Sequence, residues 1–277
     1  MRERAQRFDP RQNMHRSTFE VFHYREPKAA EVEVHHHDFY EVYFLLSGSV
    51  SYWSEGQIYS LQPGDLLLMD PMVLHRPITV AYERIVLWID KNYLERLGEQ
   101  GVSLAACFGG TRLLRPTPGQ RAELLDRFGA LVREHYGDSY GSDLYAQGIF
   151  LQLMAELNRL SLGTAPRKEE QESAAPLVKG VLEYIGEHYQ EELSLELLAG
   201  RFYVSKYHLS HEFSKAVGTG VYRYIMLRRL MAAKQLLSEG VAPGDAALRC
   251  GFRDYTNFYR AFKAEYGTAP RSFAEER

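Results

Sequence analysis

The chain has 277 residues, 45% of them hydrophobic and 25% charged, as in an ordinary folded protein. Its 2 cysteines are too few for a disulfide framework, and no apolar run approaches the ~20 residues that span a bilayer, so we expect a cytoplasmic protein of two domains. The net charge of −3 hides an asymmetry: residues 178–277 carry 14 basic and 12 acidic side chains, and residues 1–177 carry 19 and 24. The second part is weakly basic, which permits DNA binding without demonstrating it.

Residues 17–90 are rich in aromatic and β-branched residues, which favour strands. Turn signals at Ser47-Gly48, Glu55-Gly56 and Pro63-Gly64 interrupt this stretch. Their separation is close to the spacing of about 8–12 residues that is typical of antiparallel barrels and sandwiches. The pattern predicts an antiparallel β-barrel at the front of the chain.

The segment HHHDFYE places His35, His37 and Glu41 at odd positions, and an unbroken strand would turn them to one face. An antiparallel barrel could bring His75 alongside them. Three imidazoles and one carboxylate suit Zn, Ni, Fe or Mn. Three interpretations stay open: a divalent metal site, polar groups that line an effector pocket, and structural histidines.

This spacing, HxHxxxE with Gly48 downstream, resembles one half-site of the cupin barrel, whose other half-site contains a later His. Asp70 and Met72 stand where the strict metal-binding cupin pattern prefers Pro and Gly. The resemblance therefore implies a cupin-like domain whose second half-site is degenerate.

Helical spacing replaces the strand pattern from Gln120 to Leu162. The first stripe contains Leu124, Phe128, Leu131 and His135, and the second contains Leu144, Phe150, Leu151, Met154, Leu157 and Leu160. Two helices after a barrel either pack on it or form an interface with a second copy, and we expect a homodimer through residues 120–162. Residues 163–176, which are charged and small, predict a linker between domains 1–162 and 177–277.

The rest of the chain predicts an all-α domain. The expected helices cover 177–188, 194–201, 205–217, 221–238, 244–250 and 254–266, with a short tail after Pro270.

One short pattern occurs twice in this domain, 49 positions apart. A capping residue is followed four and eight positions later by apolar residues, and a glycine closes each copy. The copies are Ser205, Leu209, Phe213, Gly218 and Asp254, Phe258, Phe262, Gly267. With the helices before them they predict two helix–turn–helix motifs, at about 194–217 and 243–266.

The outward faces of the two repeated helices carry hydrogen-bonding groups suited to bases and phosphates. The first presents Lys206, Tyr207, Ser210 and His211, and the second presents Tyr255, Thr256 and Arg260, with Asn257 at the edge.

Residues 178–274 resemble the DNA-binding domain of the AraC/XylS family of bacterial transcription regulators. The matching stretches are SLELLAGRFYVSKYHLSHEFSKAVG, YRYIMLRRLMAAKQLL and CGFRDYTNFYRAFKAEYGTAPRSF. The resemblance implies that helix 221–238 holds two recognition helices in successive major grooves. Residues 206, 207, 210 and 211 would then serve one groove and residues 255, 256, 257 and 260 the other.

Three positions depart from the family pattern. Pro243 and Ala246 replace large aliphatic residues, which predicts a looser second motif. His211 stands where Arg is frequent, which predicts a weaker, pH-sensitive contact.

The leading hypothesis is a non-enzymatic regulator that binds double-stranded DNA and needs no cofactor. The resemblance implies control by a small-molecule effector in the barrel, with a carbohydrate as the family's usual class, and RNA polymerase as a further partner. The alternative is a cupin-type metal-dependent enzyme, an oxygenase or isomerase, with a DNA-binding tail. Metal analysis of the purified protein separates the two hypotheses.

Overall fold

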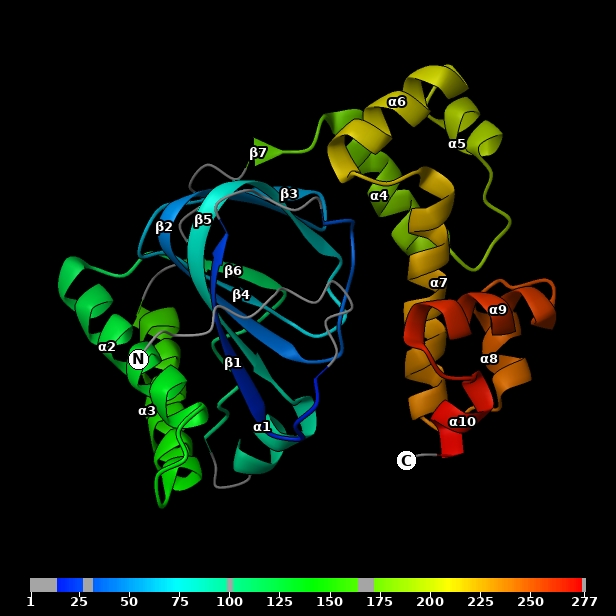
Figure 1. Cartoon of the computed structure of the whole chain (residues 1–277). Helices are drawn as coiled ribbons and strands as arrows, with labels where there is room; N and C mark the ends of the chain where they lie inside the picture. Colours follow the sequence, from blue (N-terminus) through cyan, green and yellow to red (C-terminus); the bar gives the residue numbers. More distant parts are fainter. Residues whose placement is uncertain (1–13, 27–31, 99–101, 164–171, 276–277) are drawn as a thin grey trace. The chain divides into compact units, whose positions relative to one another are not determined.

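The computed structural model describes residues 14–26, 32–98, 102–163 and 172–275 (Figure 1). The chain divides into two compact units, Met1–Glu172 and Ser173–Arg277. Most of the predicted linker, residues 164–171, lies outside the described residues. The two-residue strand β7 (Glu172–Ser173) stands at the boundary between the units.

The first unit is built on a curved antiparallel sheet, as predicted (Figure 1). Its strands run in the order β1-β5-β2-β3, and β4 pairs with both β2 and β6. The longest pairing joins β2 to β5, from Tyr40 opposite Ile89 to Ser54 opposite His75. The bounds are β1 (Phe19–Glu26), β2 (Tyr40–Ser54), β3 (Gln57–Leu61), β4 (Leu66–Met69), β5 (His75–Ile89) and β6 (Thr111–Leu114).

Both faces of this sheet are buried, because alternate residues of β2 enter two different hydrophobic clusters. Tyr43 and Leu45 belong to the cluster that the curved sheet encloses. Val42 and Phe44 belong to a second cluster, which the helices cover. The period of two residues therefore gives the barrel an interior and a helix-packed exterior.

The helices α2 (Pro118–His135) and α3 (Ser142–Gly163) pack on the outer face of the sheet. Phe150 stacks on Phe19 with ring centroids 4.5 Å apart, and Phe128 lies 5.2 Å from Phe44. Packing on the barrel, one of the two predicted roles of these helices, is confirmed. Helix α1 (Lys91–Leu97) and strand β6 were not predicted.

One predicted turn is wrong. Ser47-Gly48 lies inside β2, where the register with β5 shifts and the strand bulges. Gly48 has φ 85°, a left-handed conformation that glycine adopts without steric strain at a bulge. The turns at Glu55-Gly56 and Pro63-Gly64 are confirmed.

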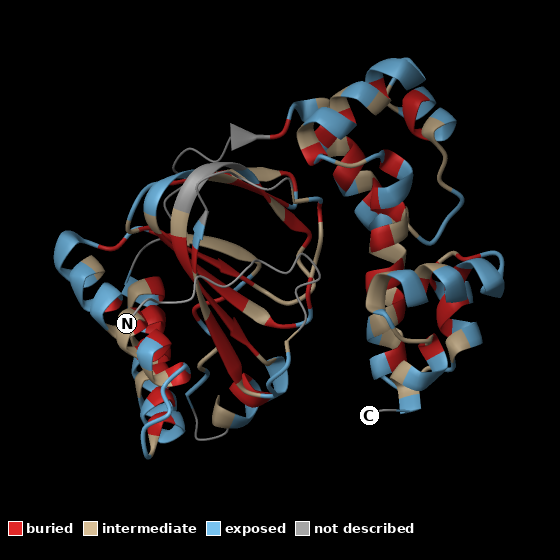
Figure 2. Cartoon of the chain, in the orientation of Figure 1, coloured by how far each residue is buried: buried red, intermediate tan, exposed pale blue. Residues whose placement is uncertain are grey.

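The second unit is helical throughout, and its helices begin and end within a few residues of the predicted bounds. They are α4 (Pro176–His188), α5 (Leu195–Arg201), α6 (Lys206–Val217), α7 (Val221–Ser238), α8 (Pro243–Arg249), α9 (Tyr255–Tyr266) and α10 (Pro270–Glu275). Figure 2 shows buried residues on one side of these helices and exposed residues on the other.

Helix α7 joins the two helix–turn–helix motifs through a continuous buried stripe. Tyr224 in its first half lies 5.6 Å from Phe213 of α6, ring to ring. Leu230 and Leu237 in its second half share a cluster with Phe258 and Phe262 of α9. Ala246 of α8 is completely buried in the same cluster, where the sequence pattern predicts a looser second motif because this residue is small.

The loop after α4 is held against both α7 and the second motif. Arg229 of α7 donates through Nε and Nη2 to the backbone oxygens of Tyr189 and Glu191, at 2.7 Å each. Gly251, in the turn between α8 and α9, approaches Gln190 so closely that a Cβ would overlap its carbonyl group. These contacts set the spacing of the two motifs within the unit.

Candidate nucleic-acid interface and barrel histidine site

The first recognition helix is α6, and a serine begins it as the repeat predicts. The side chain of Ser205 accepts a hydrogen bond from the backbone N–H of His208 at 3.1 Å. Leu209 and Phe213 are completely buried and anchor the helix. Lys206, Tyr207 and His211 are exposed, and Ser210 is half-buried.

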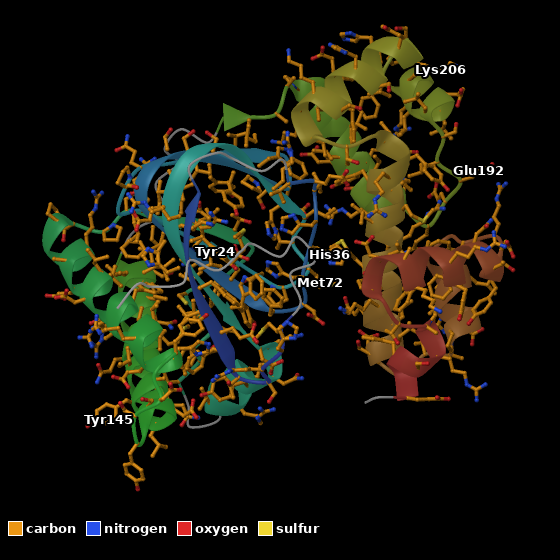
Figure 3. All side chains as sticks on the ribbon, in the orientation of Figure 1. Tyr24, His36, Met72, Tyr145, Glu192 and Lys206 are labelled. Atoms are coloured by element: carbon orange, nitrogen blue, oxygen red, sulfur yellow. The ribbon has the colours of Figure 1, made fainter. Side chains whose placement is uncertain are left out.

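Lys206 has an intramolecular partner that the sequence pattern did not reveal. Its Nζ lies 2.8 Å from Oε1 of Glu196 on α5, and both side chains are exposed. The hydrogen bond from Lys206 lowers the pKa of the Glu196 carboxyl. Figure 3 labels Lys206 on the outer surface of α6. Contact with a phosphate would therefore exchange one anionic partner of Lys206 for another.

The second recognition helix is α9. Asp254 accepts hydrogen bonds from the N–H groups of Thr256 and Asn257, at 3.0 and 3.3 Å. Tyr255, Thr256, Asn257 and Arg260 are all exposed. Among the described residues, the Arg260 guanidinium has no ion-pair partner and the Asn257 amide no hydrogen-bond partner.

Tyr203, in the turn before α6, has 95% of its surface exposed and φ 55°. It was not predicted as a contact residue. Its equivalent in the second copy is Phe252, which is 5% exposed in the core. The repeat therefore carried no signal for an exposed aromatic ring at this turn.

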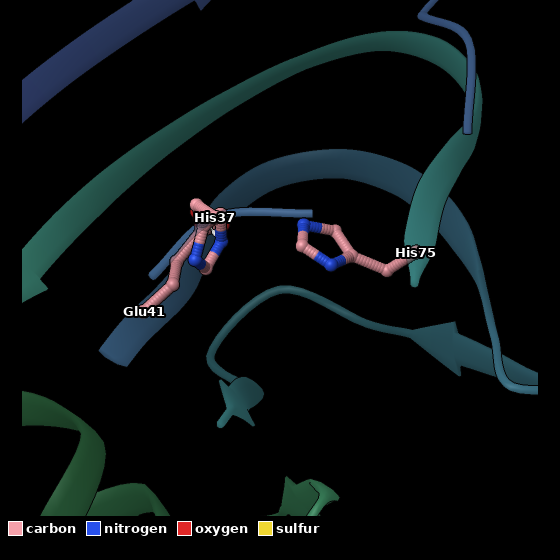
Figure 4. A group of neighbouring side chains, drawn as sticks. All are labelled: His37, Glu41 and His75. Atoms are coloured by element: carbon pink, nitrogen blue, oxygen red, sulfur yellow. Dashed lines mark ion pairs between the residues drawn. The ribbon is translucent and has the colours of Figure 1, made fainter. Parts of the chain in front are cut away.

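The barrel histidines do not lie in an unbroken strand. β2 begins only at Tyr40, and His35 forms an isolated backbone bridge with His75. The ligand atoms of His37, Glu41 and His75 nevertheless lie within 4.8 Å of one another, and all three residues are buried (Figure 4). His35 is outside this close group, although its ring is 4.4 Å from that of His75.

Backbone carbonyls set the orientation of the three imidazoles. Nδ1 of His35, His37 and His75 each lies 2.8 Å from the carbonyl oxygen of a residue two positions away. Because a carbonyl only accepts, each Nδ1 carries a proton, and in a neutral imidazole Nε2 then presents a lone pair. Nε2 of His37 lies 3.2 Å from Oε2 of Glu41, and Trp88 Nε1 donates to that oxygen at 3.0 Å.

Burial keeps two of these imidazoles neutral. Desolvation lowers the pKa of His35 to about 4, with a smaller effect from His37. Desolvation and the neighbouring histidines lower the pKa of His75 well below its usual value. Neutral imidazole is the form that binds a metal ion.

The interior of the barrel also contains a buried cation. Arg84 of β5 is 3% exposed, and its guanidinium lies 4.6 Å from the ring centre of Tyr24. The same enclosed cluster holds Tyr43, Tyr52 and Trp88. Sequence reasoning missed Arg84, although its spacing from Trp88 along β5 places it on the same inward face.

A helical unit with two helix–turn–helix motifs, preceded by a barrel with an enclosed polar cluster, defines a DNA-binding regulator with a sensor domain. Residues 19–154 match the model of the AraC-like ligand binding domain, and residues 198–276 match that of a helix-turn-helix domain. None of the helices in the described part of the chain is long and apolar enough to cross a membrane.

Relatives agree with these matches. The chain is 30% identical over 236 residues to the HTH-type transcriptional regulator YbfI of Bacillus subtilis (strain 168), covering 80% of each chain. It is 27% identical over 261 residues to the HTH-type transcriptional activator RhaS of Escherichia coli O81 (strain ED1a), covering 90% of this chain and 89% of RhaS. The chain belongs to the AraC family of transcriptional regulators, with a ligand-binding first domain and a DNA-binding second domain.

The chain is also similar to a solved DNA complex of the DNA-binding domain of AdpA, a global transcriptional factor. The identity is 24%, the match covers 37% of this chain and 93% of that one, and the TM-score is 0.36. This structural similarity is too low to add to the assignment.

Proposed function

We propose that α9 supplies most of the base specificity and that Asn257 and Arg260 are its main contacts. The observation that carries the proposal is that both side chains are exposed and unpaired among the described residues, on a helix anchored by Phe258 and Phe262. An Asn amide pairs with adenine, and an Arg guanidinium pairs with guanine.

The other predicted contacts take supporting roles. Tyr255 and Thr256 of α9 meet phosphate or a thymine methyl group. Lys206, Tyr207, Ser210 and His211 of α6 serve the neighbouring groove. Lys206 is paired with Glu196, and the imidazole of His211 lacks the two parallel N–H donors that a guanidinium offers to a base. Helix α6 therefore discriminates less between bases than α9 does.

Control comes from a small-molecule effector in the barrel, whose binding shifts the populations of DNA-competent and DNA-incompetent states. The buried aromatic rings beside Arg84 support a polar effector, and a carbohydrate is the class to screen first by thermal shift on the full chain. The role is one of binding rather than catalysis, in the cytoplasm, with RNA polymerase as a downstream partner. The regulators among the relatives support this role.

A gel-shift titration on the DNA upstream of the protein's own coding region tests the DNA contacts. Asn257→Ala and Arg260→Ala should each weaken specific binding by about 1–3 kcal/mol, roughly 5- to 150-fold in Kd. Binding to unrelated DNA should change much less.

Arg271→Ala is the matched control, because it removes an exposed arginine from α10, where Arg271 pairs with Glu275. Its specific binding should stay within about twofold of the wild type, because the control residue is assigned no base contact. Unchanged site-specific binding in both α9 variants would refute the assignment of α9.

A further inference from the structure

The polar cluster of His35, His37, Glu41 and His75, where the segment before β2 meets the start of β5, has more acceptors than donors. Nε2 of His35, His37 and His75 is buried, and among the described residues none of the three has a hydrogen-bond partner. Each Nδ1 already donates to a backbone carbonyl, so these side chains have no proton left to share with one another. Buried acceptors without donors are rare in folded proteins.

Glu41 adds a further acceptor at close range. Its Oε2 lies 3.2 Å from Nε2 of His37, outside hydrogen-bond geometry, so with a neutral imidazole these two atoms are both acceptors. Trp88 holds the carboxylate in this position through its N–H group. Figure 4 shows His37 and Glu41 side by side, opposite the ring of His75.

One water molecule cannot satisfy this arrangement, because it has two protons and three acceptors, from His37, Glu41 and His75, converge. A cation can satisfy all of them at once. Imidazole nitrogens together with one carboxylate favour divalent transition ions of the Zn²⁺ type over Ca²⁺ or Mg²⁺, which prefer oxygen ligands alone. The Nδ1 bonds and the Trp88 contact are the outer-shell support that metal ligands usually have.

We propose that the barrel binds one divalent transition-metal ion through Nε2 of His37 and His75 and the carboxylate of Glu41, with His35 as the adjacent fourth donor. The three close donors lie within 4.8 Å of one another. Tetrahedral ligands at about 2.1 Å from one ion are about 3.4 Å apart, so side-chain movements of about 1 Å bring the three donors to one ion. Tyr52, whose ring lies 6.2 Å from that of His75, connects the ion site to the aromatic interior. An effector that enters the barrel would therefore meet the ion.

The test uses the full chain without an affinity tag, stripped of metal with a chelator and dialysed. Zn²⁺ is titrated against a chromophoric chelator, and bound metal is counted by elemental analysis after gel filtration. The expected result is about one equivalent of Zn²⁺ per chain, and visible absorption bands of a nitrogen- and oxygen-ligated ion when Co²⁺ replaces Zn²⁺.

Three variants locate the ion. His37→Asn with His75→Asn should weaken binding by more than the roughly 10- to 100-fold lost when an outer-shell partner is removed. Glu41→Gln should weaken it about 10-fold and still fold, because the amide oxygen can accept from Trp88. His36→Ala is the matched control from the same segment and should bind within about twofold of the wild type, because outer positions affect affinity only when they support a ligand.

Wild-type protein that retains no metal, or equal binding by wild type and the double variant, overturns the proposal. If the double variant does not fold, the comparison of Glu41→Gln with His36→Ala still decides the outcome. The titration contains no DNA, so its failure leaves the DNA-contact proposal untouched, and the reverse also holds.

Discussion

His135 of α2 is 8% exposed, and its ring packs against those of Phe19 and Tyr136. Burial and, to a smaller extent, Arg16 lower its pKa to about 4, and Asp143 partly opposes this shift. The unfolded chain, with an ordinary imidazole pKa of about 6.5, therefore binds more protons than the folded chain between about pH 4 and 6.5. Stability is lost as the pH falls through this window.

We predict that metal-free protein loses up to about 2 kcal/mol of stability through His135 between pH 7.5 and pH 5. Burial also lowers the pKa of His35 and His75, so these residues make the stability fall with pH in the same direction. A variant is therefore needed to isolate the contribution of His135. His135→Leu should show a shallower pH dependence of the urea midpoint and of hydrogen exchange in α2. A parallel pH dependence in wild type and variant would contradict this.

At the scale of single residues, the helix caps could be predicted from the sequence, but an ion pair and a buried arginine could not. The repeat identified the caps Ser205 and Asp254 correctly, because capping depends on residues two or three positions away. The ion pair of Lys206 with Glu196 could not be inferred in the same way, because it crosses the turn between two helices. Arg84 had an alternation signal, but its burial depends on strands far away in the chain.

At the scale of elements, the turn of the second motif depends on one glycine. Gly251 has φ 81°, and a Cβ would overlap the backbone carbonyl of Gln190, which α7 holds in place through Arg229. The equivalent residue in the first copy is Phe202. The two motifs are therefore related by pattern but supported differently.

Gly251→Ala should destabilise the second unit by about 2 kcal/mol or more, from the left-handed backbone and the carbonyl overlap together. Hydrogen exchange of the α8 and α9 amides measures the change. Gly200→Ala, inside α5 with open space around it, is the control and should be neutral or stabilising by about 0.5–1 kcal/mol. Equal stability of the two variants would exclude a close approach at Gly251.

Two predictions about the strands of the first unit were wrong. The Ser47-Gly48 signal suggested a turn, but β5 pairs with β2 on both sides of it, so the strand continues through a bulge. The histidines were expected on one strand face, but His35 and His37 precede β2. They approach His75 because His35 and His75 exchange backbone hydrogen bonds.

At the scale of the whole molecule, α3 keeps an apolar strip that its own unit does not cover. Leu144, Tyr145 and Leu151 are 74%, 69% and 42% exposed. Figure 3 shows Tyr145 projecting from the end of α3. Large exposed apolar side chains in one strip are typical of an interface, in keeping with the homodimer that the sequence predicts through residues 120–162.

We predict that Leu144→Glu with Tyr145→Glu shifts the full chain from dimer to monomer, raising the dimer dissociation constant at least about tenfold, because two charges would be buried at the contact. Sedimentation equilibrium measures the mass. Val102→Glu, at a residue that is 67% exposed outside α2 and α3, is the matched control and should stay dimeric. A wild-type chain that is monomeric at all concentrations would exclude this interface.

Local patterns in the sequence were enough for the two helix–turn–helix motifs, their caps, their buried stripes and the family, because helices depend on residues within about four positions. Those patterns also supplied the residues of both candidate sites. Only the tertiary structure decided which of the histidines meet Glu41, that Arg84 is buried in the barrel and that Lys206 is paired. Sheet pairing and inter-helix contacts join residues far apart in the chain, so no local spacing records them.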